Sequence, residues 1–104
     1  MKKLEAMRHE DEIASGLELR HLRTFRMVAG TGNFTRAGAE LGYSQSTVTT
    51  HIKTLERTLG AELFERSRFS KQIVLTEAGK RVLKYSEKLL ALADETVQQA
   101  LSGA

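Results

Sequence analysis

A set of amide, hydroxyl and amino side chains falls on one face of a predicted helix in the middle of the chain. The opposite face collects large aliphatic residues at helical spacing. The polar face holds no large apolar residue and no acid, and its members are Gln45, Ser46, Thr49, Thr50 and Lys53. Such groups suit base edges in the major groove of duplex DNA. A glutamine amide pairs in two places with adenine, a threonine methyl meets thymine, and a lysine reaches phosphate or guanine.

The same face has a simpler interpretation, which is the solvated side of an amphipathic helix. A solvated face usually mixes glutamate with lysine, whereas this face is rich in hydroxyl and amide groups. A further alternative is a winged-helix module that binds another protein and does not recognise DNA. An acidic face would favour that alternative. We therefore expect sequence-specific binding of double-stranded DNA and keep the protein-interaction module as the alternative.

The residues before this face predict a helix-turn-helix. Thr35 is expected to cap a short helix over residues 35–41. Gly42 can adopt the left-handed conformation that ends a helix, and Ser44 is expected to cap the next one. This recognition helix, residues 44–59, would lie in the major groove. The helix before it contains Gly38, and a glycine inside a helix suggests that another helix crosses close by.

Phosphate contacts are expected around this pair of helices. Arg36, at the start of the second helix, can reach the DNA backbone that this helix crosses. Thr35 and Ser44 mark helix N-termini, which favour phosphate. Both residues can equally be caps and nothing more.

Residues 61–75 change to a strand-like pattern. Two apolar segments, Leu63-Phe64 and Ile73-Val74-Leu75, flank a polar and basic tip, which predicts a two-stranded β hairpin. We call residues 65–73 the wing. Its basic residues, Arg66, Arg68 and Lys71, can hold phosphates or enter the minor groove. A basic loop is often only solvated, but its place after a helix-turn-helix favours the DNA contact.

Two further helices are predicted, over residues 19–30 and 77–101. The first shows a single apolar face. The second is capped by Thr76 and is apolar on more than one side, so we expect one side to pack on its own domain and another on a second chain. The expected dimerisation residues are Val82, Tyr85, Leu89, Leu92, Ala93 and Thr96.

Composition limits the possible functions. The formal charge is +3 and the 104 residues include no cysteine, so disulfides, thiolate catalysis and cysteine zinc sites are excluded. The three histidines lack metal-ligand spacing, no Ser-His-Asp arrangement is recognisable, and no glycine loop suits a phosphate. We expect neither an enzyme nor a cofactor or metal. Without an apolar segment for a membrane or a signal peptide, we expect a cytoplasmic protein.

Several segments, in order and at their spacing, resemble the N-terminal domain of LysR-type transcriptional regulators. The similarity covers residues 18 to about 101 and includes Leu19-Arg20-His21-Leu22-Arg23-Thr24-Phe25, Asn33-Phe34-Thr35-Arg36-Ala37, Leu41-Gly42-Tyr43-Ser44-Gln45-Ser46, Ile52-Lys53-Thr54-Leu55-Glu56, Leu59-Gly60, Leu63-Phe64-Glu65-Arg66 and Leu75-Thr76-Glu77-Ala78-Gly79. The resemblance implies a mainly α fold, namely a winged helix-turn-helix with a three-helix core and a two-stranded β wing, followed by a long linker helix.

The family further implies a bacterial protein associated with the nucleoid, and a function for each part. Linker helices pair antiparallel into a homodimer, which binds an interrupted palindrome, and full-length relatives form tetramers. Gln45 and the following turn of its helix contact bases, while wing arginines contact the backbone or the minor groove. Relatives often have proline at the position of Ser46, arginine at that of Thr50 and alanine at that of Gly38, so we expect Thr50 to change what is recognised.

The expected organisation has three parts. Residues 1–16 form an N-terminal extension, which is a short helix, a disordered arm or a vector-derived segment. Residues 17–75 form the DNA-binding domain, and residues 76–104 form the linker helix. Family members continue into an effector domain that binds an inducer. This chain stops near the point where that domain would begin, so we expect no inducer pocket in it. It is either a piece of a longer protein or a stand-alone module.

Overall fold

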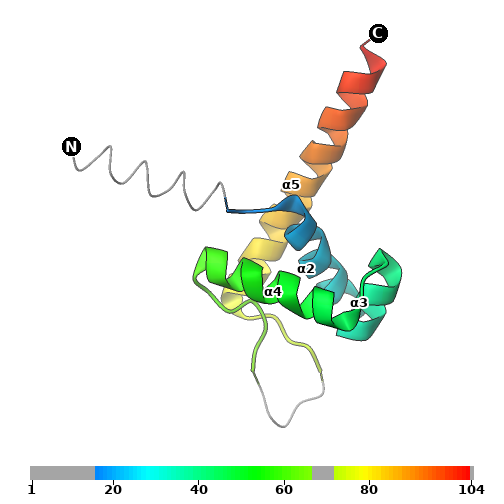
Figure 1. Cartoon of the computed structure of the whole chain (residues 1–104). Coiled ribbons are helices and arrows are strands. Elements are labelled where there is room, and N and C mark those ends of the chain that lie inside the picture. Colours follow the sequence, from blue (N-terminus) through cyan, green and yellow to red (C-terminus); the bar gives the residue numbers. More distant parts are fainter. Residues whose placement is uncertain (1–15, 67–71, 104) are drawn as a thin grey trace, which may run out of the picture.

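The computed structural model describes residues 16–66 and 72–103. Within these ranges the chain is mainly helical (Figure 1). The helices are α2 (Leu19–Thr31), α3 (Phe34–Leu41), α4 (Gln45–Leu59) and α5 (Glu77–Ser102). All four predicted helices are therefore present, with ends within a residue of those expected. The predicted extension, residues 1–16, lies outside the described residues except for Gly16.

Glycines in the left-handed conformation end the first three of these helices. Gly32, Gly42 and Gly60 have φ values of 67°, 77° and 68°. Since L side chains rarely adopt this conformation, glycine at these places closes each helix with little strain. The tight turn expected at Gly42, between α3 and α4, is confirmed.

The N-terminal caps agree with the predictions at two helices and differ at one. Ser44 accepts a hydrogen bond from the backbone N–H of Thr47, and Thr76 accepts one from Gly79. The predicted cap of α3, Thr35, is wrong, because the side chain of Asn33 accepts from the N–H of Arg36. Helix α3 thus begins one residue earlier, which places Thr35 in its first turn and frees its hydroxyl group for another partner.

The core lies where α2, α3, α4 and α5 meet. Phe25 and Val28 of α2 are fully buried, as are Val48 and Leu55 of α4. The ring of Phe64 lies between two other aromatic rings, with centroids 5.4 Å from Phe25 and 6.0 Å from Phe34. Helix α4 packs on this apolar centre with one face only, so its opposite face lies on the surface of the protein.

Gly38 lies at the closest approach between α3 and the start of α4. A Cβ atom there would be 2.6 Å from the carbonyl oxygen of Tyr43 and 3.3 Å from Cγ2 of Val48. The close neighbour expected from the sequence is therefore present, and it consists of the turn itself together with α4. Glycine lets the two helices of the helix-turn-helix pack this closely.

The predicted two-stranded β wing is not present as strands in the described residues. Phe64 and Leu75 form an isolated antiparallel bridge. The N–H of Glu65 donates to the carbonyl of Val74 at 2.8 Å, and that of Thr76 donates to Leu63 at 3.0 Å. The base of the hairpin is thus paired, but too few residues pair to make a ladder. The tip, residues 67–71, lies outside the described residues.

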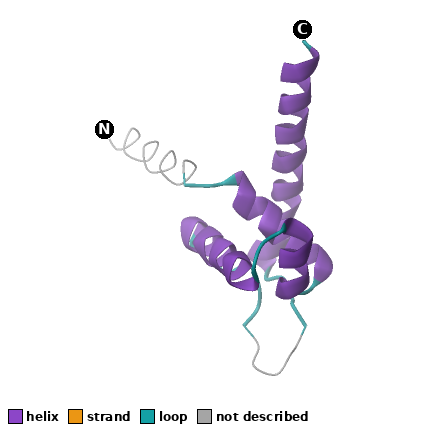
Figure 2. Ribbon diagram, turned by 45° about the vertical axis from the view of Figure 1, so that its right-hand side comes forward, coloured by secondary structure: helices purple, strands orange, loops and turns teal. Residues whose placement is uncertain are grey.

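Helix α5 packs on the domain with its first half and projects beyond it with its second (Figures 1 and 2). Gly79, Ser86 and Leu90 are buried against the domain. An ion pair of 2.9 Å joins Arg23 of α2 to Asp94 near the point where α5 leaves the body. The projecting half carries large apolar residues that no described residue covers, including Val97 and Leu101.

Candidate nucleic-acid interface

The polar face predicted from the sequence lies on the outside of α4. Val48, Ile52 and Leu55 are buried on the inner face. Of the five polar residues, Gln45, Ser46, Thr50 and Lys53 are exposed and Thr49 is partly buried. The face is therefore available to a partner along more than two turns. Among the described residues Lys53 forms no ion pair, so its charge is not neutralised within them.

The start of α4 is ordered by its own hydroxyl groups. The Oγ of Ser44 accepts from the N–H of Thr47 at 3.2 Å and donates to its Oγ1 at 3.0 Å. The Oγ of Ser46 lies 3.1 Å from the Oγ of Ser44. Ser44 therefore works as the cap, and its side chain is already engaged within the helix.

A hydrogen bond of 3.1 Å connects the two helices of the helix-turn-helix on their outer side. The hydroxyl of Thr35 donates to Oε1 of Gln45. Next to it, Arg36 is exposed and forms no ion pair with another described residue. The structure thus brings Thr35, Arg36 and Gln45 to one end of the polar face.

The wing contributes one described basic residue. Arg66 donates to Oε1 of Glu56 at 2.7 Å, while Oε2 of Glu56 accepts the N–H of Leu63 at 2.8 Å. The Glu56 side chain is only 10% exposed and that of Arg66 is 51% exposed. Arg66 is thereby fixed, with part of its guanidinium still open to solvent. The other predicted wing contacts, Arg68 and Lys71, lie outside the described residues.

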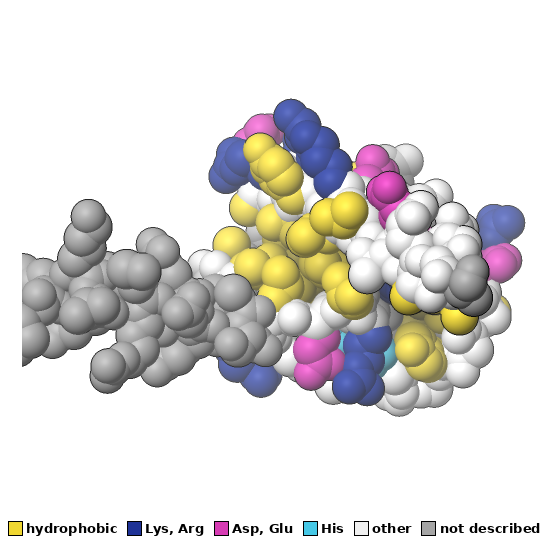
Figure 3. Space-filling view, turned by 90° about the horizontal axis from the view of Figure 1, so that it is seen from above, with side chains coloured by type: hydrophobic (Ala, Val, Ile, Leu, Met, Phe, Trp, Pro, Cys, Tyr) yellow, Lys and Arg dark blue, Asp and Glu magenta, His cyan; other side chains and the backbone are white. Residues whose placement is uncertain are grey.

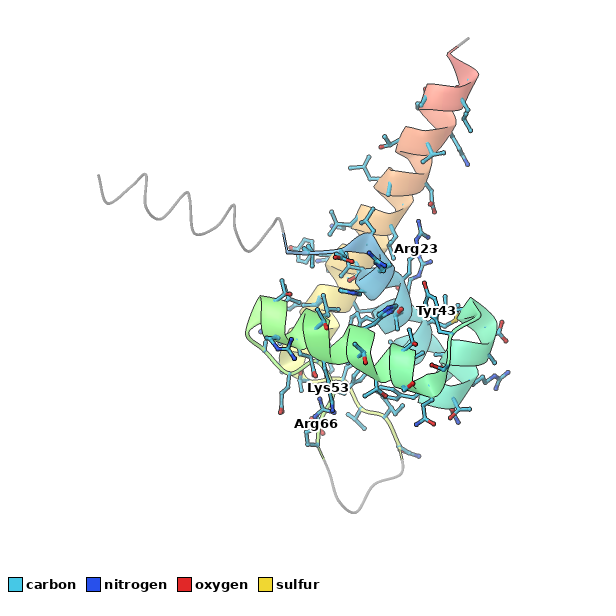
Figure 4. All side chains as sticks on the ribbon, viewed as in Figure 1. Arg23, Tyr43, Lys53 and Arg66 are labelled. Carbon is cyan, nitrogen blue, oxygen red and sulfur yellow. The ribbon has the colours of Figure 1, made fainter. Side chains whose placement is uncertain are left out.

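The side chains of Lys53 and Arg66 extend to the same side of α4, the side on which the hairpin leaves the body (Figure 4). They come from two different parts of the chain, since Lys53 is in α4 and Arg66 lies in the segment after α4 that leads into the hairpin. Two positive charges on one side suit a polyanion.

A histidine pair behind α4 was not identified as a structural unit from the sequence. The rings of His21 and His51 have centroids 4.8 Å apart. The Thr24 hydroxyl donates to the carbonyl of Arg20 at 3.0 Å, so the 2.8 Å contact between Thr24 and His51 requires Nδ1 of His51 to donate. This hydrogen bond between His51 and Thr24 joins α4 to α2. The helical position of His51, between the polar and apolar faces, was the available signal.

Burial lowers the pKa of His51 below its usual value of 6.5, and the nearby His21 and Arg20 lower it further. Glu18 acts in the opposite direction. The neutral form that donates to Thr24 is therefore favoured. On the other side of His51, the ring of Tyr43 packs edge-on at 5.0 Å.

The predicted dimerisation residues separate into exposed and covered positions. Tyr85, Leu89 and Leu92 are 56%, 42% and 59% exposed, and Thr96 is exposed with its hydroxyl donating to Leu92. Val82 and Ala93 are partly buried against the domain. The exposed members follow one another at a helical spacing of three or four residues, so they form one stripe along α5.

An apolar groove of about 340 Å³ runs beside this stripe. Figure 3 shows hydrophobic side chains gathered on this face, with Lys and Arg side chains at its edge. The groove is lined by Leu17, Leu22, Leu59, Arg81, Val82, Tyr85, Ser86 and Leu89.

The described ranges, residues 16–66 and 72–103, lack the features of a metal site and of a membrane-spanning helix. No group of three or more His, Asp or Glu side chains there could hold a metal ion. No helix in those ranges combines the length and the hydrophobicity that crossing a bilayer requires.

Comparison with known proteins gives a consistent result. Residues 19–80 match the model of a family described as bacterial regulatory helix-turn-helix protein, lysR family. The uncharacterised HTH-type transcriptional regulator YwqM of Bacillus subtilis is 46% identical over 79 residues, which are 76% of this chain and 26% of that protein. The HTH-type transcriptional regulator BudR of Klebsiella aerogenes is 42% identical over 84 residues, 81% of this chain and 57% of that protein.

Solved structures with the same fold include complexes with DNA. The crystal structure of the BenM_DBD/benA site 1 DNA complex has a TM-score of 0.79 and 35% identity, and the match covers 85% of this chain and all of that one. The CbnR_DBD–DNA complex has a TM-score of 0.77 and 34% identity, with 84% and 98% covered. Among the first curated relatives, by contrast, the chain spans about a quarter of their length.

Proposed function

The chain belongs to the LysR family of bacterial regulatory helix-turn-helix proteins, and we propose on that premise that it binds double-stranded DNA sequence-specifically as the DNA-binding module of a transcription regulator. The observation that carries the proposal is the exposed amide and hydroxyl face of α4. Beside it lie Lys53, which forms no ion pair with another described residue, and Arg66, whose side chain is partly open to solvent. The fold of relatives solved in complex with DNA supports it.

In this proposal α4 enters the major groove, which at about 12 Å admits one helix. Gln45 and Thr49 contact base edges, and Ser46, Thr50 and Lys53 line the rest of the surface. Because the N-terminal residues of a recognition helix meet the bases first, Gln45 is the principal base contact.

Phosphate contacts hold the domain in place. Arg36 and the helix N-termini near Thr35 and Ser44 would face one strand. The wing, residues 65–73, would meet the backbone or the minor groove through Arg66, Arg68 and Lys71. The polar face of α4 carries a single positive charge, so much of the affinity must come from these outer contacts.

We further propose that two chains pair through α5 and bind an interrupted palindrome, one α4 in each half-site. The stripe of Tyr85, Leu89 and Leu92 and the groove beside it supply an apolar surface for a second copy. Two recognition helices must lie about 34 Å apart, or a multiple of that, to enter successive major grooves on one side of the duplex.

Sites selected from a pool of random duplexes by the full chain would test the function. We expect an enriched palindrome with a central spacer, bound with an affinity that falls steeply between about 50 and 200 mM salt. Gln45→Ala should flatten the base preference at one position of each half-site. Gln98→Ala, an exposed glutamine of α5, should leave the preference unchanged. Absence of duplex binding even at low salt would overturn the proposal and favour the protein-interaction module.

A further inference from the structure

The hydrogen bond between Thr35 and Gln45 joins the two helices of the helix-turn-helix. Thr35 lies in the first turn of α3 and Gln45 is the first residue of α4. Their contact of 3.1 Å is the one direct side-chain hydrogen bond between α3 and α4 among the described residues. Both residues are exposed, so the pair lies on the surface that the proposed function places against DNA.

The chemistry of a hydroxyl group restricts what Thr35 can do. A threonine hydroxyl has one proton to donate. Thr35 donates it to Oε1 of Gln45, so the same hydroxyl cannot donate to a phosphate while this bond is present. Helix α3 has its own cap in Asn33, which leaves Thr35 no capping role. The hydrogen bond to Gln45 is therefore the interaction that the Thr35 hydroxyl makes among the described residues.

The bond holds the carboxamide of Gln45 beside α3, with Oε1 toward the hydroxyl of Thr35. With Oε1 turned toward Thr35, the oxygen retains one free acceptor position and Nε2 retains two donors. Neither nitrogen donor is engaged by another described residue. Without the tether, the side chain of Gln45 can leave this position for other rotamers. Such a movement would displace the donors and the acceptor that Gln45 presents to a base.

We propose that Thr35 is a positioning residue that sets the base preference of Gln45. This inference rests on the proposed function and deepens it. Adenine offers an acceptor and a donor side by side in the major groove, and only one orientation of the amide matches both. Thr35 holds the amide in one position before DNA binds. When the groove excludes water from the pair, the hydrogen bond strengthens because the local dielectric constant falls.

The test compares Thr35→Val, which removes the hydroxyl at nearly constant size, with Thr35→Ser, which keeps it. Competition binding would measure each variant against the selected duplex and against duplexes carrying the three other bases at the position that Gln45→Ala identifies. A bidentate amide contact discriminates bases by about 5- to 150-fold. We expect T35V to reduce this discrimination at least threefold at that position alone, and T35S to retain it.

The double variant T35V/Q45A distinguishes positioning from an independent contact. If Thr35 acts through Gln45, the double variant should match Q45A, because no amide remains to be oriented. Equal weakening on all duplexes, together with a smaller salt slope, would overturn the inference and identify Thr35 as a phosphate contact. Unchanged discrimination in T35V would also overturn it. Both results leave the proposed function intact, whereas failure of the unaltered chain to bind any duplex removes the function itself.

Discussion

The carboxylate of Glu56 bridges Arg66 and the backbone N–H of Leu63, at 2.7 Å and 2.8 Å. Each oxygen has its own donor, and the side chain is nearly buried. Glu56 belongs to α4, whereas its two partners belong to the segment that leads into the hairpin. The recognition helix and the base of the wing are therefore held in one fixed relation, and a charge that could contact DNA is positioned by an internal acid.

Glu56→Gln should destabilise the fold by about 1 to 3 kcal/mol, because an amide offers one acceptor oxygen where two charged ones serve two donors. Urea unfolding followed by circular dichroism measures the change. Glu62→Gln is the matched control, since Glu62 approaches the same Arg66 only to 3.9 Å and is 65% exposed. It should change stability by less than about 0.5 kcal/mol. Equal losses in the two variants would contradict the assignment to Glu56.

Gly79→Ala should be strongly destabilising. A Cβ atom at Gly79 would lie 2.1 Å from the carbonyl oxygen of Leu63, and this backbone cannot retreat without breaking its hydrogen bond from Thr76. Overpacking of this kind costs about 1 to 3 kcal/mol or more. At Gly30 in α2, an added Cβ meets nothing within 4 Å beyond its chain neighbours and its own helix backbone, so Gly30→Ala should instead stabilise by about 0.5 to 1 kcal/mol. Melting temperatures that move in the same direction for both variants would refute this prediction.

Leu92→Glu should weaken the proposed dimer. Leu92 is 59% exposed and lies on the stripe with Tyr85 and Leu89, where a buried carboxylate in the dimer would lack a partner. Sedimentation over a dilution series should show dimers of the unaltered chain and monomers of the variant. Ala91→Glu introduces the same side chain at an exposed position on the other side of α5 and should leave the dimer intact. A monomeric unaltered chain at high concentration would rule out the dimer.

Stability should fall as the pH drops below neutrality, in part through His51. Its pKa is lowered in the fold, chiefly by burial, so the unfolded chain takes up the proton first. The contribution of His51 is fully present above its unfolded pKa near 6.5 and is lost as the pH falls from there through the folded pKa. His51→Gln should therefore show a shallower loss in urea unfolding between about pH 7 and 5. Parallel curves for the two proteins would exclude this role.

Thr50→Arg should raise the affinity for duplex DNA. Thr50 is exposed on the polar face of α4, where the resemblance gives relatives an arginine and where Lys53 is the existing cation. One added phosphate contact should steepen the slope of log affinity against log salt by about 1. Gln98→Arg adds the same charge on α5 and should change the slope less. An unaltered slope in T50R would place Thr50 away from the DNA.

Local features of the sequence determined the elements and their ends. Gly42 and Gly60 marked where helices stop, because they supply the left-handed conformation. Ser44 and Thr76 marked where helices begin, because each side chain accepts a hydrogen bond from the backbone N–H three residues later. The spacing of Val48, Ile52 and Leu55 determined which face of α4 is buried. These signals act between residues that are close in the chain, so the sequence alone was sufficient for them, and for the polar face they leave outside.

Tertiary packing decided the relations between elements. Asn33 displaced Thr35 as the cap of α3, because two polar residues so close together compete for the same N–H groups and the packing of Phe34 selects one register. The hairpin was predicted as two strands, but only Phe64 and Leu75 pair as a bridge among the described residues. The contacts of Thr35 with Gln45 and of Glu56 with Arg66 join residues ten positions apart. Their geometry depends on the angle at which helices and loops pack, and no local pattern of residues specifies that angle.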